Sequence, residues 1–143
     1  MHGFLEKRVA EYMSAPVVGV PPDTALPDLE SRFAAHDFNS FPVLDGDLLV
    51  GVVTKFDILK VFAFTPRSVV PSYELLSQRR ASQIMTRDVI TFTPDTPLPR
   101  VLQTLVDFRV KSFPVVDGRR VVGMIAREDL VRALRDTCGV ANT

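Results

Sequence analysis

The stretch Ser40-Phe41-Pro42-Val43-Leu44-Asp45-Gly46 returns seventy-two positions later as Ser112-Phe113-Pro114-Val115-Val116-Asp117-Gly118. In both copies a short apolar run containing a proline leads into Asp-Gly, a dipeptide typical of the tight turn of a β-hairpin. A second apolar run follows each turn, at residues 48–53 and 121–126. The repeated stretch therefore predicts two similar β-hairpins.

The duplication extends outward from the hairpins over most of the chain. Residues 9–62 align with residues 81–134 without a gap, so that Asp57, for example, corresponds to Asp129. Self-similarity over such a period indicates a repeated structural unit. We therefore expect a site that is built by one copy to have a counterpart in the other.

Each copy has the pattern helix-β-α-β-β-α, which predicts an α+β fold with a small sheet covered by helices. The central helix is indicated by apolar residues at helical spacing, and a β-branched run before it has the length of a strand. The elements expected besides the hairpins are an opening helix at residues 9–13 and 81–85, a first strand at 17–20 and 89–92, and a closing helix at about 55–62 and 127–134.

The start of the central helix is marked by Pro-Asp-Thr in both copies. Thr24 and Thr96 stand where a helix N-cap is expected, because a threonine hydroxyl can accept a hydrogen bond from a free N–H of the first turn. Pro27 and Pro99 fall within the first turn, where a missing N–H costs little.

The copies are joined by residues 63–80, which contain Pro66, Pro71 and several serines. This composition predicts a linker with a short helical piece near residues 73–78. Its apolar pairs indicate that it packs against the rest of the chain.

Composition restricts the class of protein but does not name a partner. The 143 residues are 46% hydrophobic with a formal net charge of zero, which is enough apolar material for a core and gives no support to nucleic-acid binding. No apolar run approaches the length of a membrane span, and the first residues do not resemble a secretory signal. Cys138 is the single cysteine, so no internal disulfide is possible. We expect a cytoplasmic protein.

The Phe-Pro-Val-x-Asp-Gly stretches, together with Gly51-Val52-Val53-Thr54-Lys55-Phe56-Asp57 and its counterpart at residues 123–129, resemble the CBS domain, a family named after cystathionine β-synthase. The resemblance implies two tandem CBS repeats packed about a pseudo-twofold axis, at residues 5–63 and 81–137, with residues 64–80 as the linker. Such a pair is often called a Bateman module.

The resemblance also implies a function. Pairs of this family commonly bind adenosine-containing ligands such as AMP, ADP, ATP or S-adenosylmethionine, need no cofactor, and act as regulatory modules rather than enzymes. They often form a homodimer, a disc of four CBS repeats, and report to a regulated protein that the sequence does not identify.

Asp57 and Asp129 are the leading candidates for ligand binding. On the family interpretation each carboxylate accepts hydrogen bonds from the ribose hydroxyls, Thr54 binds ribose or phosphate, and Gly51 allows a close approach of the backbone. The alternative is a capping box, in which Thr54 and Asp57 only stabilise the start of a helix. Because Ala126 replaces the threonine in the second copy while the aspartate remains, we favour the ribose.

Ala126 further predicts two unequal clefts, with the second one weaker or differently selective because one polar contact is lost. Lys111 and Arg127 make that cleft more basic, which suits a phosphate. Backbone groups of the first strand and of the segment before each proline are expected to hold adenine, since Pro42 and Pro114 lack an N–H and would leave neighbouring groups unpaired. The expected ligand-binding residues are Val18, Val20, Asn39, Ser40, Phe41, Pro42, Gly51, Thr54, Asp57, Ile90, Phe92, Lys111, Ser112, Phe113, Pro114, Arg127 and Asp129. The four apolar residues of the first strands among them are alternatively core.

The sequence also bears on two other classes of function. A ligand-free dimerisation or docking module for an enzyme or transporter remains open, because Ala126 departs from the family pattern. An enzyme is disfavoured, since no nucleophile–base pair and no metal-ligand spacing of histidine or cysteine is found.

Overall fold

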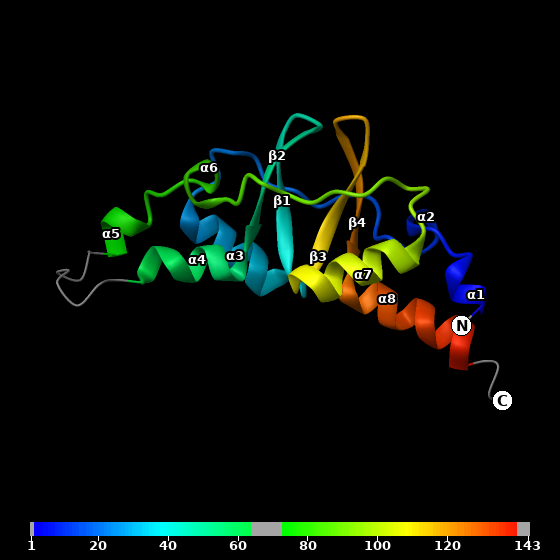
Figure 1. The fold of residues 1–143 in the computed structure, drawn as a ribbon. Coiled ribbons are helices and arrows are strands. Elements are labelled where there is room, and N and C mark those ends of the chain that lie inside the picture. Colours follow the sequence, from blue (N-terminus) through cyan, green and yellow to red (C-terminus); the bar gives the residue numbers. More distant parts are fainter. Residues whose placement is uncertain (1, 64–72, 140–143) are drawn as a thin grey trace. The chain divides into compact units, whose positions relative to one another are not determined.

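The computed structural model describes residues 2–63 and 73–139, and the chain divides into two compact units (Figure 1). The middle unit consists of residues 18–89, and the terminal unit combines residues 1–17 with residues 90–143.

In its described residues, 18–63 and 73–89, the middle unit contains one β-hairpin and four helices. Its elements are α3 (Leu26–Ala35), β1 (Ser40–Asp45), β2 (Leu48–Thr54), α4 (Lys55–Phe62), α5 (Tyr73–Leu76) and α6 (Ala81–Ile84).

The terminal unit repeats this arrangement with material from both ends of the chain. Its elements are α1 (His2–Leu5), α2 (Val9–Tyr12), α7 (Leu98–Phe108), β3 (Ser112–Asp117), β4 (Arg120–Ala126), α8 (Arg127–Leu134) and a π-helical turn, η1 (Arg135–Gly139).

Both predicted hairpins are confirmed. β1 pairs with β2 and β3 with β4, both antiparallel, and Asp45 faces Leu48 as Asp117 faces Arg120 across the turn. Gly46 and Gly118 have φ values of +63° and +66°, which a residue with a side chain adopts only with strain. The Asp-Gly dipeptides therefore specified the turns, and with them the register of the strands.

The opening helices are exchanged between the repeats. α2, which opens the first copy, packs in the terminal unit, where Val9 lies in one core with Leu98 and Phe113. α6 opens the second copy, yet its Ala81 belongs to the core of the middle unit with Phe41. The compact units therefore differ from the sequence repeats, whose boundaries remain a prediction.

Main-chain hydrogen bonds fix this exchange. The N–H of Val9 donates to the carbonyl oxygen of Thr96 at 2.9 Å, and the N–H of Ala81 donates to that of Thr24 at 2.8 Å. The guanidinium of Arg8 donates to the carbonyl oxygen of Asp95 at 3.2 Å, and Arg80 binds Asp23 in the same way at 3.1 Å. Each opening helix is thus fastened to the Pro-Asp-Thr turn of the other sequence repeat.

The predicted first strands are wrong as continuous strands. Residues 17–20 and 89–92 contribute single parallel bridges, Val20 to Val43 and Phe92 to Val115. The N–H of Val20 donates to Pro42 at 2.9 Å, and its carbonyl oxygen accepts from Leu44 at 2.9 Å. In each segment, a single bridged residue satisfies the local backbone hydrogen-bonding groups. The pairing does not continue into a strand.

The predicted N-caps at Thr24 and Thr96 are also wrong. The residues before α3 and α7 are Ala25 and Pro97, and neither provides a side-chain cap. The hydroxyl of Thr24 instead donates to the carbonyl oxygen of Pro21 at 2.7 Å, which closes the preceding turn. Proline does lie in the first turn of both helices, as predicted.

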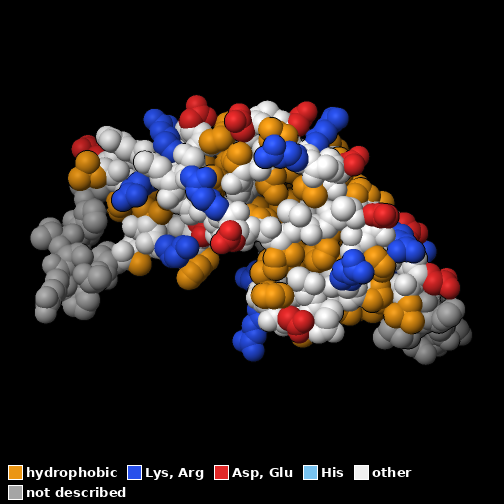
Figure 2. Space-filling model, turned by 45° about the horizontal axis from the view of Figure 1, so that its top comes forward, with side chains coloured by type: hydrophobic (Ala, Val, Ile, Leu, Met, Phe, Trp, Pro, Cys, Tyr) orange, Lys and Arg blue, Asp and Glu red, His pale blue; other side chains and the backbone are white. Residues whose placement is uncertain are grey.

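The helical piece expected in the linker is confirmed as α5, whereas residues 64–72 lie outside the described residues. Hydrophobic side chains reach the face shown in Figure 2. Within the described parts of the chain, no helix combines the length and apolar character needed to cross a bilayer.

Candidate functional site

Asp57 lies at the start of α4 in the middle unit and is 3% exposed. Its Oδ2 accepts hydrogen bonds from the N–H and the hydroxyl of Thr54, at 2.9 and 3.0 Å. Its Oδ1 lies 3.1 Å from the ammonium of Lys60. The hydroxyl of Thr86 lies between the two oxygens, at 3.2 and 3.3 Å. The carboxylate is therefore buried and surrounded by donors.

Asp129 occupies the equivalent place at the start of α8 in the terminal unit. Its Oδ2 accepts from the N–H of Ala126 at 2.8 Å, and its Oδ1 accepts from the guanidinium of Arg132 at 3.2 Å. Burial raises the pKa of the Asp129 carboxyl above its ordinary value, against the lowering effects of these two donors. The two donors therefore do not fully offset the free-energy cost of burying the Asp129 carboxylate.

Arg132 connects Asp129 to the exchanged helix α2. Its Nη2 donates to the carbonyl oxygen of Tyr12 at 3.0 Å, and the guanidinium carbon lies 5.4 Å from the centre of the Tyr12 ring. The Tyr12 hydroxyl in turn donates to Asp136 at 3.0 Å. The equivalent Lys60 of the middle unit instead lies over the ring of Phe56.

The capping box weighed as an alternative is present in the middle unit. The N–H of Asp57 donates to the Thr54 hydroxyl at 3.1 Å, and the Asp57 carboxylate accepts the N–H of Thr54 in return. Asp129 keeps the second of these bonds although Ala126 has no hydroxyl. The presence of Asp129 therefore has a structural explanation without a ligand, and the sequence comparison between the copies does not decide between the two roles.

Gly51 does lie where another segment approaches closely, but that segment is the chain itself. A Cβ at Gly51 would stand 2.5 Å from the sulfur of Met85 and 2.9 Å from the carbonyl oxygen of Thr86. Gly123 has the same relation to Met13 and Ser14. These glycines admit the segments that follow α6 and α2, respectively.

Most of the apolar residues expected to hold adenine are buried in the cores. Val20, Phe41 and Phe113 are at most 1% exposed, and Phe92 is also buried. Val18 and Ile90 are half-buried beside the cores, so they are the members of this group with surface left for a ring.

We expected the missing N–H of each proline to leave neighbouring backbone groups unpaired, but the carbonyl oxygens opposite the prolines are hydrogen-bonded. Opposite Pro42, the carbonyl oxygen of Val52 accepts the N–H of Thr86 at 2.8 Å, and opposite Pro114, that of Met124 accepts the N–H of Ser14 at 2.8 Å. Pro42 and Pro114 are buried within β1 and β3, and their carbonyl oxygens accept from Val20 and Phe92. The backbone groups nearest to the prolines are therefore already hydrogen-bonded within the protein.

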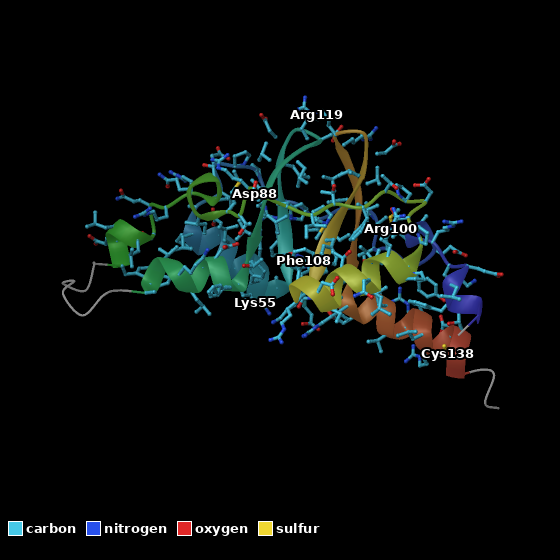
Figure 3. All side chains as sticks on the ribbon, in the orientation of Figure 1. Lys55, Asp88, Arg100, Phe108, Arg119 and Cys138 are labelled. Atoms are coloured by element: carbon cyan, nitrogen blue, oxygen red, sulfur yellow. The ribbon has the colours of Figure 1, made fainter. Side chains whose placement is uncertain are left out.

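Most of the polar candidates lie nearer the surface than the apolar ones. Lys111 is exposed, and its carbonyl oxygen accepts the N–H of Arg127 at 2.9 Å. The Arg127 side chain is exposed and forms an ion pair with Glu128 at 3.3 Å. Asn39 and Ser112 are half-buried, Ser40 is buried, and Lys55 is exposed at the start of α4 (Figure 3).

Thr86 was missed by the sequence analysis. It follows the short helix α6, and its position gives no sign of Asp57, which lies 29 residues earlier. Thr86 directly follows Met85, which corresponds to Met13 in the first copy. Its contact with Asp57, however, depends on the exchange of the opening helices.

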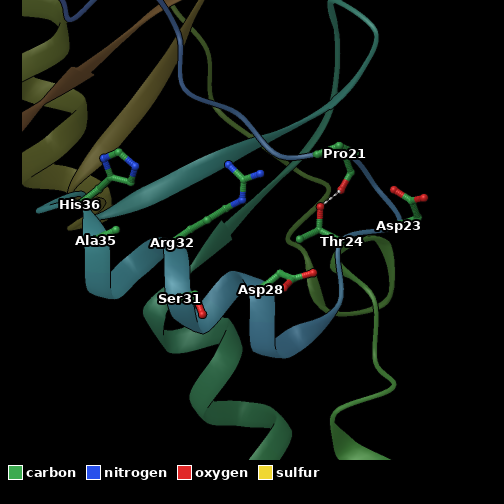
Figure 4. A pocket seen from close by; sticks show the side chains of 8 residues that line it. All are labelled: Pro21, Asp23, Thr24, Asp28, Ser31, Arg32, Ala35 and His36. Atoms are coloured by element: carbon green, nitrogen blue, oxygen red, sulfur yellow. Dashed lines mark hydrogen bonds between the residues drawn. The ribbon is translucent and has the colours of Figure 1, made fainter.

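A separate hollow of about 600 Å³ lies beside α3 (Figure 4). The side chains of Asp23, Asp28, Arg32 and His36 line it together with the turn at Pro21. None of the expected ligand-binding residues lines this hollow. No group of three or more potential metal ligands is present among the described residues.

The model of the CBS domain family matches residues 9–63 and 81–136, which together make up most of the chain. The chain belongs to the CBS domain family. Its CBS pair is similar to the solved CBS domain pair of protein MJ0100 in complex with 5′-methylthioadenosine and S-adenosyl-L-methionine, with 27% identity and a TM-score of 0.75 over 91% of this chain and 97% of that one. CBSX2 in complex with AMP shares the fold, at 22% identity and a TM-score of 0.76, over 90% of this chain and 96% of that one.

Two curated relatives of this CBS pair are enzymes of greater length. L-aspartate semialdehyde sulfurtransferase of Methanocaldococcus jannaschii is 32% identical over 81% of this chain, which corresponds to 22% of the enzyme. A-adding tRNA nucleotidyltransferase of Geobacter sulfurreducens is 26% identical over 88% of this chain and 13% of the enzyme. The chain therefore spans less than a quarter of either enzyme, and the likeness is confined to that portion.

Proposed function

We propose that this CBS pair is a regulatory module that binds an adenosine-containing ligand, such as AMP, ADP, ATP or S-adenosylmethionine. The observation that carries the proposal is a buried carboxylate at the start of the closing helix in each unit, Asp57 in one and Asp129 in the other. A carboxylate can accept hydrogen bonds from both hydroxyls of a ribose. The complex of the MJ0100 pair with two adenosine derivatives supports this class of ligand.

The exposure of the other candidates indicates which of them can contribute to the proposed sites. Val18 and Ile90 retain surface on which an adenine ring can pack. Asn39 and Ser112 are polar and half-buried, and Lys111 and Arg127 offer positive charge for a phosphate. A ligand phosphate is also favoured by the positive end of the helix dipole at the start of α4 and α8.

The proposed output is a change in shape or stability that a partner protein detects, with the pair acting as a homodimer and carrying out no catalysis. Exposed apolar residues at matching positions of the closing helices support self-association: Leu59 on α4 is 67% exposed, and Val131 on α8 is 64% exposed.

Equilibrium titration with AMP, ADP, ATP and S-adenosylmethionine tests the proposal. We expect saturable binding of at least one ligand, strongly weakened when Asp57→Asn and Asp129→Asn are combined in one chain. Asparagine keeps an oxygen for the helix cap, so these variants remove the charge without removing the cap. Absence of binding at about millimolar concentration, the weak end of ordinary affinities, would refute it.

A ligand-free docking module is the second candidate, and the capping role of both aspartates favours it. Under this alternative, Leu59→Glu and Val131→Glu abolish self-association, while no adenosine ligand changes thermal stability. Phe108→Glu is the matched control, because Phe108 is 64% exposed on α7 (Figure 3), outside the closing helices.

A further inference from the structure

The Asp57 carboxylate has its acceptor positions filled by the protein. Two ionised oxygens offer about four lone-pair sites. The N–H and hydroxyl of Thr54 occupy two of them on Oδ2, the Lys60 ammonium occupies one on Oδ1, and the Thr86 hydroxyl bridges both oxygens. A ribose diol that binds here must displace one or more of these donors.

The Asp129 carboxylate is filled to a lesser extent. Among residues 2–63 and 73–139, it receives the Ala126 N–H on one oxygen and the Arg132 guanidinium on the other. Ala126 has no hydroxyl to add, and Ser14, which corresponds to Thr86, is exposed and forms no hydrogen bond with Asp129. Each Asp129 oxygen therefore retains one acceptor position, although its side chain is only 8% exposed.

The basic partners of the two carboxylates, Arg132 and Lys60, also leave Asp129 less fully occupied than Asp57. Arg132 is held by the Tyr12 carbonyl and ring, so it stabilises Asp129 through one nitrogen while its other end is anchored. Lys60 has one compact ammonium, placed directly on Asp57. A lysine ammonium has three donors, and among the described residues Lys60 has the Phe56 ring beside it but no main-chain acceptor like the Tyr12 carbonyl.

We propose that these donors make the two sites unequal in affinity. A ribose diol binds more tightly at Asp129, because hydrogen bonds from Thr86 and Thr54 already occupy the Asp57 carboxylate. Thr86 is then a specificity-determining residue, because its hydroxyl competes with the ligand for the same carboxylate. This inference rests on the proposed function. It reverses the order expected from the sequence, where Ala126 was counted as a lost ligand contact rather than as a donor absent from Asp129.

Burial raises the pKa of the Asp129 carboxyl, and the hydrogen bonds from Ala126 and Arg132 oppose this only in part. A diol that donates two hydrogen bonds to it favours the charged form and lowers this pKa. Carboxyl carbon NMR of Asp129 in the absence and presence of AMP measures that change directly, independently of any affinity.

The test uses AMP and the full chain, with one site removed at a time. Asp57→Asn leaves the Asp129 site, and Asp129→Asn leaves the Asp57 site. We expect the tighter affinity to remain in Asp57→Asn and to be lost in Asp129→Asn. The pKa of Asp129 is expected to fall on saturation with AMP.

Thr86→Val tests the competition in the Asp129→Asn background. Valine keeps the shape of threonine and leaves the main-chain hydrogen bonds between Thr86 and Val52 intact. We expect AMP affinity to rise by about fivefold, the value of one hydrogen bond that no longer has to be displaced. Ser14→Ala in the Asp57→Asn background is the matched control, and its AMP affinity is expected to stay unchanged.

The outcomes separate the two proposals. If the wild-type chain binds none of AMP, ADP, ATP and S-adenosylmethionine, the proposed function is refuted together with the order of sites. If AMP binds but Thr86→Val weakens it or leaves it unchanged, Thr86 is a ligand contact or a bystander, and only this inference is overturned. Tighter binding in Asp129→Asn than in Asp57→Asn also overturns it.

Discussion

At the scale of single residues, Asp57 and Asp129 show how one substitution changes the environment of a carboxylate. The sequence aligns them without a gap, yet Thr54 against Ala126 and Thr86 against Ser14 give them different sets of donors. The hydroxyl of Thr54 both caps α4 and binds Asp57, so its absence in α8 leaves Asp129 with weaker compensation for burial. A difference that looks like a lost ligand contact in the sequence is a difference in acceptor capacity in the structure.

The pH dependence of stability follows from Asp129. Its folded-state pKa is raised, so between the unfolded and folded pKa values the folded chain holds a proton that the unfolded chain has released. The free energy of unfolding therefore receives a contribution from Asp129 that falls as pH rises through this window.

We expect the stability of the wild-type chain relative to Asp129→Asn to fall as the pH rises above about 4, the ordinary pKa of an aspartate carboxyl. Urea unfolding of both proteins measures the difference. A relative stability that rises with pH would show that the hydrogen bonds from Ala126 and Arg132 outweigh the burial of the charge.

At the scale of elements, local signals predicted the parts whose cause is local. Asp-Gly fixed the two hairpin turns, and the helices α4 and α8 end and begin where the apolar pattern placed them. The first strands and the threonine caps failed because their hydrogen bonds depend on neighbours. Val20 pairs with the proline segment for one residue, and Thr24 turns its hydroxyl to Pro21.

The candidate site was predictable to the same extent. The two aspartates were found from their repeated position, whereas Thr86 and Arg132 were not, because their contacts join segments far apart in the chain or run between a helix and an exchanged neighbour. Val20, Phe41 and Phe113 were expected at a ligand but are core, since apolar residues beside a binding segment and apolar residues under it look alike in a sequence.

The glycines of β2 and β4 are expected to be necessary for packing. Gly51→Ala would place a Cβ 2.5 Å from the Met85 sulfur and 2.9 Å from a main-chain oxygen that cannot move away freely. We expect a loss of about 1–3 kcal/mol in the free energy of unfolding, the usual cost of overpacking. Met85→Ala in the same chain should relieve part of the loss, and a double-mutant cycle in urea measures the coupling. Additive effects would contradict the proposed clash with the side chain.

The arginines that fasten the opening helices form a matched pair. Arg8→Met and Arg80→Met each remove one hydrogen bond to a turn carbonyl and keep an apolar stem of similar length. We expect each to lower the free energy of unfolding by about 0.5–1.5 kcal/mol, with additive effects because the residues lie in different units. Thermal unfolding of the two single variants and the double variant tests this, and unchanged stability in both would assign the fastening to the main-chain bonds alone.

At the scale of the whole molecule, the repeats in the sequence and the compact units in the structure have different boundaries. Val9 is fully buried among residues of the second repeat, and Ala81 is fully buried among residues of the first. Each unit therefore completes its core with a helix that the sequence assigns to the other repeat. This arrangement also brings Thr86 to Asp57 and Tyr12 to Arg132, so the surroundings of both candidate carboxylates depend on it.

The exchange predicts which fragments of the chain can fold. A fragment of residues 18–89 contains the complete middle unit, including α6 and its Ala81. A fragment of residues 5–63 contains the whole first sequence repeat, but it lacks α6 and carries α2 without the core that Val9 fills. We expect the first fragment to unfold cooperatively in urea and the second to show no cooperative transition, as followed by circular dichroism. Both fragments include the β1–β2 hairpin and α4, so the comparison isolates the opening helix. Cooperative unfolding of residues 5–63 would show that α2 can occupy the place of α6, and the exchange would then be a preference between equivalent helices rather than a requirement of the fold.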